Sequence, residues 1–521
     1  MKAKYIVPGI MFLLTSLIAC EDFLTEDPKE MVSEKSLFEK EETIIQTLLS
    51  SYHSLHGIYG WRNFSKMYGI TSDDVEFVHQ SHPDRQEMNN YTFNPNSGPL
   101  IEPWMFSWES LSRANLVLDY IPDSATTLVS QPFIDRIKAE ARFLRGWNYF
   151  NLVRTFKTVP LITVYRDLPR DPPRADEAEL WKLIISDFQA GVESRSYNGN
   201  EISVLPGWKT IAADEKGRIT RGAAKAALGW AYMTRASLEI ASSTDMDSAL
   251  FWFNEVINTE EYGLWEYYYD AFYPPNKNQL EDIFSFQQLA SSSQFPSRQQ
   301  RDHSPKICDI VGRENWGYGN FPVTEALYQA MEDGDERKER ILRGDFYAMH
   351  HAGDTGYYGW VTDSSKMYTT DPHPRYPEVP LAYTQKWCDY TSTDDATSES
   401  NMNFQLIRYS NILLLHSEAT NKLYGSTPDA YTGINMVRER SGLAPLSGLD
   451  QMELREAIRN ERWIELHAEG VRWFDLMRWG IKKEKVEAAK PYVTVNMDLY
   501  EYFPIPQREV DANPNLNNPN W

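Results

Sequence analysis

The chain has 521 residues, of which 42% are hydrophobic and 24% are charged, proportions typical of a globular protein with a large buried core. Its 74 acidic residues outnumber its 52 basic ones, so the formal net charge is −22. This charge argues against nucleic acid as a partner, because nucleic-acid binding depends on Lys and Arg neutralising phosphates. The three cysteines form no CxxC pair, which excludes a disulfide framework and a structural zinc site.

The first 20 residues have the layout of a bacterial lipoprotein signal. Lys2 and Lys4 precede a mostly apolar stretch, residues 6–19, whose 14 residues are too few to span the hydrocarbon core of about 30 Å. Residues 17–20, Leu-Ile-Ala-Cys, resemble the lipobox, in which the Cys thiol is acylated and the chain is cleaved before it. We therefore predict a signal peptide over residues 1–19 and a lipid anchor on Cys20.

Seven segments of the remaining chain have the apolar period of amphipathic helices, with apolar residues three and four positions apart. The segments with this period are 44–56, 133–156, 220–239, 249–258, 403–424, 428–440 and 450–480. They predict a mostly α-helical fold. Three long connections, 57–103, 262–322 and 343–400, lack a sustained period but are rich in aromatic residues, which favours functional loops over disorder.

Two helix pairs have a repeat-like composition. Residues 227–232 contain small and aromatic residues, and residues 249–253, after the turn, contain three aromatic residues. In tetratricopeptide pairs, small residues in the first helix let the two backbones approach, and aromatic residues fill the remaining gap. Residues 412–424 and 430–440 have the same layout. A generic antiparallel helix hairpin fits nearly as well, and both alternatives predict a scaffold of stacked helix pairs.

The C-terminal segment 459–480 is the sharpest motif of the chain. On one continuous helix it would present an apolar stripe, and Glu461, Glu465 and Glu469 would follow one face with Arg462 and Arg472 as ionic partners. Neighbouring carboxylates can act in acid–base catalysis. Acidic residues interleaved with arginines on a packed helix more commonly form a structural ion-pair network, and we adopt that interpretation.

The same segment resembles the C-terminal signature of the SusD/RagB family, surface glycan-binding lipoproteins of Bacteroidota. The family pattern is close to ER-x-x-EL-x-x-EG-x-RW-x-D-x-x-RWG, and the chain has each of these residues between Glu461 and Gly480. Five further blocks match in the family's order, at 20–28, 104–115, 141–161, 407–419 and 503–519. The resemblance implies a SusD-like helical fold with tetratricopeptide-like pairs and long loops, divided into an N-terminal region, 20–220, and a C-terminal region, 221–521.

The resemblance also implies a function. Members of the family are anchored by lipid in the outer membrane, face the exterior and pass oligo- or polysaccharide to a SusC-like TonB-dependent transporter. The acidic pair Glu21 and Asp22 resembles the signal that exports such lipoproteins to the outer face. Two alternatives stay open: a peptide- or glycoprotein-binding lipoprotein of a RagAB-type uptake system, and a scaffold whose helix pairs hold other envelope proteins.

Glycan binding predicts a set of candidate residues in the loops. A sugar has an apolar C–H face ringed by hydroxyls, so it is recognised by aromatic platforms with polar groups at their edge. The candidate platforms are Tyr59 and Trp61 in the first loop, Trp316 and Tyr318 in the second, and Tyr358 and Trp360 in the third. The candidate polar groups are Asp74, Asp73, Arg62 and Asn315. The alternative for each is packing beneath its own loop, as we expect for Trp104 and Trp108 in the core.

Enzyme motifs are absent from the sequence. It has no GxSxG elbow, HExxH helix, P-loop or GxGxxG fingerprint. A glycoside hydrolase needs two carboxylates about 5 to 10 Å apart in a cleft, whereas Asp73 and Asp74 are adjacent and diverge on an extended chain. We therefore expect a binding protein without catalytic residues, metal or cofactor.

Overall fold

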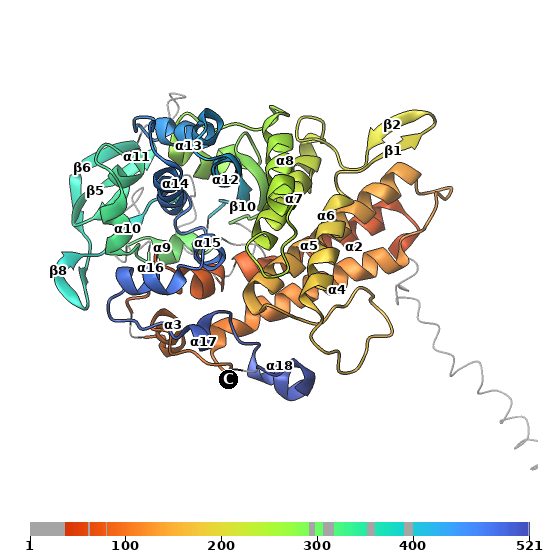
Figure 1. Cartoon of the computed structure of the whole chain (residues 1–521), viewed down its shortest axis with the longest axis horizontal. Coiled ribbons are helices and arrows are strands. Elements are labelled where there is room, and N and C mark those ends of the chain that lie inside the picture. The colour runs from red at the N-terminus through yellow and green to blue at the C-terminus, as the bar shows by residue number, and fades with distance from the viewer. Residues whose placement is uncertain are drawn as a thin grey trace, which may run out of the picture.

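The computed structural model describes residues 37–60, 63–79, 81–290, 297–305, 317–351, 360–389, 400–518 and 520, and for 348–351 and 360–366 only the backbone. Helices dominate this part of the chain and the strands are short (Figure 1), which confirms the predicted mostly α-helical class. Among the residues described, no helix is both long and apolar enough to cross a membrane. The predicted signal peptide and Cys20 lie outside the described residues.

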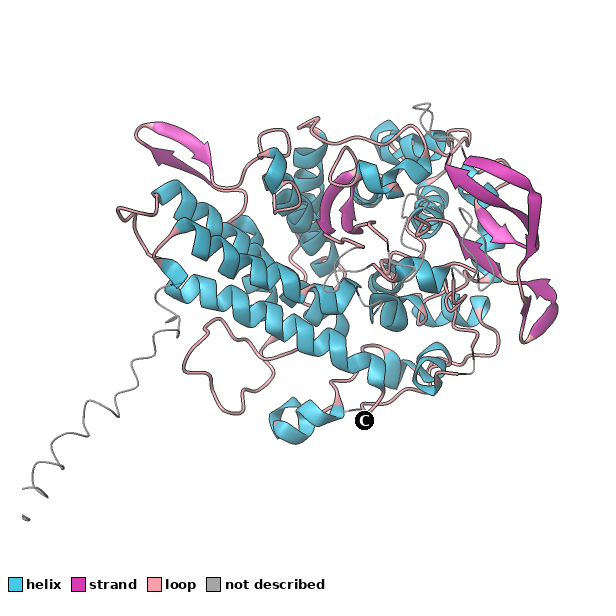
Figure 2. Cartoon of the chain, turned by 180° about the vertical axis from the view of Figure 1, so that it is seen from behind, coloured by secondary structure: helices cyan, strands magenta, loops and turns pink. Residues whose placement is uncertain are grey.

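Long helices pack side by side in the N-terminal region (Figure 2). They are α2 (Glu41–Ser54), α4 (Ile101–Tyr120), α5 (Gln131–Phe156) and α6 (Glu177–Gln189), with the short α3 (Pro83–Asn89) between the first two in sequence. Every residue from Phe143 to Phe156 is buried, so the second half of α5 is the centre of the apolar core. The core continues into the C-terminal region, where the Trp230 ring lies 5.8 Å from the Phe150 ring.

The two predicted helix pairs are present. They are α7 (Arg221–Arg235) with α8 (Asp245–Ile257), and α12 (Tyr409–Tyr424) with α13 (Pro428–Arg440). A Cβ atom on Gly229 would lie 2.5 Å from the Phe253 ring, and one on Gly433 would lie 2.2 Å from the Leu413 carbonyl oxygen. Because only glycine permits such an approach, the helices of each pair pack closely, as the tetratricopeptide-like and the generic hairpin alternatives both predict.

The predicted continuous helix over 450–480 is wrong at its centre. A capping box of Asp450 and Glu453 begins α14 (Gln451–Glu465), and α15 (Arg472–Arg478) begins only after a turn. Ala468 and Gly470 in this turn have φ angles of 58° and 71°, outside the helical region. The predicted apolar stripe therefore does not exist. The chain ends with α16 (Lys482–Ala489), α17 (Met497–Tyr500) and α18 (Gln507–Ala512).

The described strands form two-stranded antiparallel sheets. They pair as β1 (Ser194–Tyr197) with β2 (Asn200–Ser203), β3 (Asp282–Phe286) with β10 (Phe404–Arg408), β4 (Ile341–Arg343) with β9 (Ala382–Thr384), β5 (Asp345–His351) with β6 (Trp360–Thr369), and β7 (Pro372–His373) with β8 (Tyr376–Pro380). The hairpins β1–β2 and β5–β6 lie at opposite ends of the molecule (Figure 1). The helix predicted over 403–424 is wrong at its start, since β10 occupies its first turn and every β10 residue is buried.

Short helices interrupt the long connections. Helix α9 (Gln299–His303) lies in the second, and π-helical turns at His56–Gly60 and Ser65–Gly69 lie at the start of the first. Helices α10 (Glu325–Ala330) and α11 (Glu336–Glu339) lie between the second and third connections. The three connections predicted as loops are therefore loops with short helices and strands in them, and one of these, α9, positions the candidate site.

Candidate functional site

Helix α9 joins the three long loops. It belongs to the second loop, and Gln299 donates from Nε2 to the Tyr59 carbonyl oxygen of the first loop at 3.2 Å. The Ser65 hydroxyl, also of the first loop, donates to Gln299 Oε1 at 3.1 Å. The Gln300 side-chain oxygen accepts from the backbone N–H of Asp389, in the third loop, at 2.8 Å. The three aromatic-rich connections predicted from the sequence therefore meet at one short helix.

Residues 317–321 lie against the end of α9. The Gly319 N–H donates to the Ser304 carbonyl oxygen at 2.9 Å, and its own carbonyl oxygen accepts from His79 Nε2 at 3.0 Å and from the Tyr383 hydroxyl at 3.3 Å. A Cβ atom on Gly317 would lie 2.2 Å from the Pro305 carbonyl oxygen, and Gly319 has a φ of 60°. Both positions thus require glycine, and together they fix the backbone on each side of Tyr318.

Tyr318 projects from this frame into solvent. Its side chain is 43% exposed, and the guanidinium carbon of Arg301 lies 4.2 Å from the ring centroid. Arg301 is the one residue of α9 that is not buried. The guanidinium packs against part of the ring and holds it in place. The rest of the ring is available for stacking. Tyr318 is therefore an exposed aromatic group on a rigid support.

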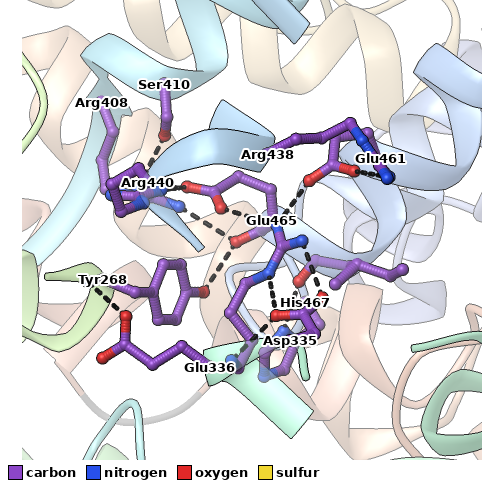
Figure 3. A network of polar contacts seen from close by, with 12 residues as sticks. Tyr268, Asp335, Glu336, Arg408, Ser410, Arg438, Arg440, Glu461, Glu465 and His467 are labelled. Atoms are coloured by element: carbon purple, nitrogen blue, oxygen red, sulfur yellow. Dashed lines mark hydrogen bonds and ion pairs between the residues drawn. The ribbon is translucent and has the colours of Figure 1, made fainter. Parts of the chain in front are cut away.

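The C-terminal glutamates lie elsewhere, in a buried ionic network (Figure 3). Arg337 of α11 binds Glu461 at 2.6 Å and Glu465 at 3.0 Å, and Arg440 at the end of α13 binds Glu465 at 2.6 Å. Arg408 at the end of β10 binds Glu465 at 3.0 Å and Glu469 at 2.8 Å. Burial alone would raise the pKa of Glu465, but the three arginines hold it well below its usual value.

This network has a structural role. The carboxylates of Glu461, Glu465 and Glu469 are all buried and ion-paired, so none of the three is placed to exchange protons with a substrate, and the structural interpretation is confirmed. The predicted ionic partners were wrong. Arg462 binds Asp475 at 2.9 Å and Arg472 binds Asp73 at 2.7 Å, while the glutamates take arginines from three other elements.

Comparison with known proteins identifies the family. The model of the SusD family matches residues 252–521, and a second model, described as starch-binding associating with outer membrane, matches residues 22–213. This chain belongs to the SusD family. The SusD-like protein P25 of Formosa agariphila is 25% identical over 99% of this chain and 98% of its own length.

Solved structures share the fold. A SusD homolog from Bacteroides thetaiotaomicron superposes with a TM-score of 0.76 and 22% identity, over 93% of this chain and 97% of that one. A laminarin-binding SusD-like protein superposes with a TM-score of 0.73 and 23% identity, over 91% of this chain and 98% of that one. The SusD-like fold expected from the sequence blocks is thus confirmed.

Tyr59 is not a platform in this SusD-family chain, so the prediction for it is wrong. Its side chain is 1% exposed, and its hydroxyl accepts hydrogen bonds from Trp147 Nε1 at 3.1 Å and Asn151 Nδ2 at 3.2 Å. Burial raises the pKa of the hydroxyl above its usual value. Its ring stacks on Phe404 of β10 at 5.4 Å. Tyr59 therefore fixes the first loop to the core.

The prediction for Asp74 as an edge carboxylate is also wrong. Asp74 is fully buried, and its Oδ2 accepts from the Ala468 N–H at 3.0 Å. Burial raises its pKa, which hydrogen bonds lower in part. Asp73 is buried as well, in its ion pair with Arg472. Both carboxylates hold the first loop against the C-terminal signature instead of lining a ligand site.

The other candidates remain predictions. Trp61, Arg62, Asn315, Trp316 and Tyr358 lie outside the described residues. The backbone of Trp360 begins β6 opposite His351. Tyr318 is thus the one predicted platform whose side chain is both described and exposed.

Arg301 was missed by the sequence analysis. The run 299–303, Gln-Gln-Arg-Asp-His, contains only polar residues, and nothing in it distinguishes the outward residue from the buried ones. The buried residues are those that bond to the first and third loops, and only the folded chain brings these partners together.

Proposed function

We propose that this protein captures oligo- or polysaccharide on the face formed by α9, residues 317–321 and the adjoining ends of the three long loops. The observation that carries the proposal is the exposed Tyr318 ring on a frame fixed from all three loops. An aromatic face packs against the C–H face of a sugar, and a rigid ring loses little entropy on binding. The laminarin-binding protein of the same fold supports a glycan as the ligand.

We further propose that the protein acts at the outer membrane. Acylation of Cys20 would anchor it there, facing the exterior, and it would deliver bound glycan to a SusC-like TonB-dependent transporter. The lipobox-like residues 17–20 and the description of the family model that matches residues 22–213 support this location. With the buried glutamates of the C-terminal signature engaged in ion pairs, the protein binds its glycan without cleaving it.

Affinity electrophoresis tests the glycan proposal. The mature chain, 20–521, carrying Cys20→Ser to avoid lipidation, would be run through gels containing single plant, host or microbial polysaccharides or a peptide mixture. We expect retardation by a polysaccharide and a loss of affinity of about tenfold in Tyr318→Ala. Tyr424→Ala is the matched control, because Tyr424 is 60% exposed at the end of α12 and should not affect binding.

Three outcomes would contradict the proposal. Retardation by the peptide mixture alone would favour a RagAB-type function, and unchanged glycan affinity in Tyr318→Ala would remove Tyr318 from the site. Release of reducing sugar from any polysaccharide would show that the protein is an enzyme.

A further inference from the structure

Arg301, on the proposed glycan-binding face, is a cation without an acidic partner among the residues that the structure describes. Within the part of the chain that the structure describes, its guanidinium makes no ion pair and no hydrogen bond, and its one recorded side-chain contact is the Tyr318 ring. Other arginines of the fold, such as Arg472 and Arg462, are bound to carboxylates. The Arg301 donors are therefore available to a ligand.

The position of Arg301 is fixed by its neighbours on α9. Gln299 and Gln300 are fully buried and hydrogen-bonded to the first and third loops, and His303 is buried beside Ser65 at 3.2 Å. The Arg301 carbonyl oxygen accepts the N–H of Tyr318, so the guanidinium and the ring come from backbone segments that are directly bonded. The pair is thus preorganised, and little conformational entropy is lost when a ligand binds it.

The two groups together select a ligand chemistry. The N–H donors of a guanidinium lie in its plane and bind the paired oxygens of a carboxylate or sulfate, and this geometry is specific to arginine. The neighbouring phenol ring suits the apolar face of a sugar. A neutral glycan would stack on the ring but offer no anionic group to the guanidinium. An acidic sugar would contact both groups.

The overall charge makes such a pair selective. A net charge of −22 repels polyanions from most of the surface, so an acidic glycan is not retained by general ion exchange. Arg301, which has no acidic partner among the described residues, then gives an anion one local site of attraction next to the exposed ring.

We propose that Arg301 and Tyr318 form a subsite for an anionic sugar, in which Arg301 binds a carboxylate or sulfate group and the Tyr318 ring carries the sugar face. This inference rests on the proposed glycan-binding function and names the class of glycan.

The experiment compares acidic polysaccharides with neutral counterparts of the same backbone. The mature chain carrying Cys20→Ser is run against polygalacturonate and carboxyl-reduced polygalacturonate, and against dextran sulfate and dextran. The first pair tests a carboxylate and the second a sulfate. We expect the acidic member of a pair to bind more tightly, and Arg301→Gln to weaken that binding about tenfold or more without changing the affinity for the neutral member.

Two variants serve as controls. Arg170→Gln removes the same charge from an exposed position in the 158–175 loop and should leave binding unchanged. Arg301→Lys keeps the charge but loses the planar pair of donors, so it should weaken acidic binding less than Arg301→Gln does. Arg301→Lys also keeps the test decisive if the glutamine variant does not fold.

The outcomes separate this inference from the proposed function. Equal affinity for acidic and neutral members, or equal effects of Arg301→Gln and Arg170→Gln, would overturn the anionic subsite, while loss of neutral binding in Tyr318→Ala would still support glycan capture. No binding to any of the four polysaccharides or to the wider glycan panel would overturn both.

Discussion

Arg472 and Asp73 form a two-point ion pair between residues 399 positions apart in sequence. Arg472 Nε lies 2.7 Å from Asp73 Oδ1, and Nη2 lies 2.8 Å from Oδ2. Both side chains are buried, at 5% and 1% exposure. The pair joins the C-terminal signature to the first loop, which also contributes Tyr59 and Ser65 to the frame beneath the candidate site.

Removing one member of this pair should be strongly destabilising. Asp73→Asn leaves the Arg472 guanidinium buried without its counter-charge, which we expect to lower the free energy of unfolding by about 3 to 5 kcal/mol. Urea denaturation measures the change. Glu193→Gln is the control, since Glu193 and Arg195 are 47% and 44% exposed and their pair contributes about 1 kcal/mol or less. If both substitutions lowered the free energy of unfolding equally, the buried pair would contribute no more to stability than the exposed one.

Gly470 should be irreplaceable in the turn between α14 and α15. Gly470→Ala forces a Cβ atom into a backbone with φ of 71° and to within 1.9 Å of the Phe64 ring, so we expect a loss of at least about 3 kcal/mol. Gly480→Ala is matched in backbone conformation, with φ of 68°, but no heavy atom of the described residues lies within 4 Å of the new Cβ. It should lose only about 1 kcal/mol. Similar denaturation midpoints for both variants would contradict the steric argument.

The same turn shows which part of the fold could be predicted. The bounds of α13 agree with the predicted segment 428–440 because its apolar period and its packing face coincide. The break near Gly470 could not be predicted, since it is set by the Phe64 ring, some 400 positions earlier in sequence. β10 was taken for a helix because all five of its residues are buried, which leaves no alternation for a strand to reveal.

The candidate site was predictable only as a region. Aromatic content indicated the three loops, and α9 does connect them. The direction in which each loop side chain points was not predictable, because an inward Tyr59 and an outward Tyr318 look alike in sequence. The distinction depends on hydrogen bonds from Trp147 and Asn151 to Tyr59 and on the Gly317 and Gly319 geometry beside Tyr318.

His303 should make the stability of the protein depend on pH. Burial lowers its pKa from 6.5 to about 4, so the folded state holds the ring neutral while the unfolded state takes up a proton below pH 6.5. Its contribution to stability is therefore present above pH 6.5 and is lost as the pH falls from about 6.5 to 4, by about 3 kcal/mol in total.

The measurement compares unfolding free energies of the wild type and His303→Gln at several pH values. Other groups titrate in both proteins, so their difference isolates His303. We expect the advantage of the wild type to shrink steadily from pH 6.5 to pH 4. A difference that does not change with pH would mean that folding leaves the pKa of His303 unshifted.

Gly317 should matter more for ligand binding than for global stability. Gly317→Ala places a Cβ atom 2.2 Å from the Pro305 carbonyl oxygen, and the backbone must move away. Because the next residue is Tyr318, that movement displaces the ring from Arg301, and we expect glycan affinity to fall about tenfold. Gly98→Ala is the control, since among the described residues its new Cβ contacts only the Asp84 carboxylate, at an ordinary 3.4 Å. Affinity electrophoresis measures binding, and thermal melting measures stability. If Gly317→Ala melts like the wild type but no longer binds glycan, the effect lies at the site. Full binding by Gly317→Ala would show that the position of Tyr318 tolerates the backbone shift.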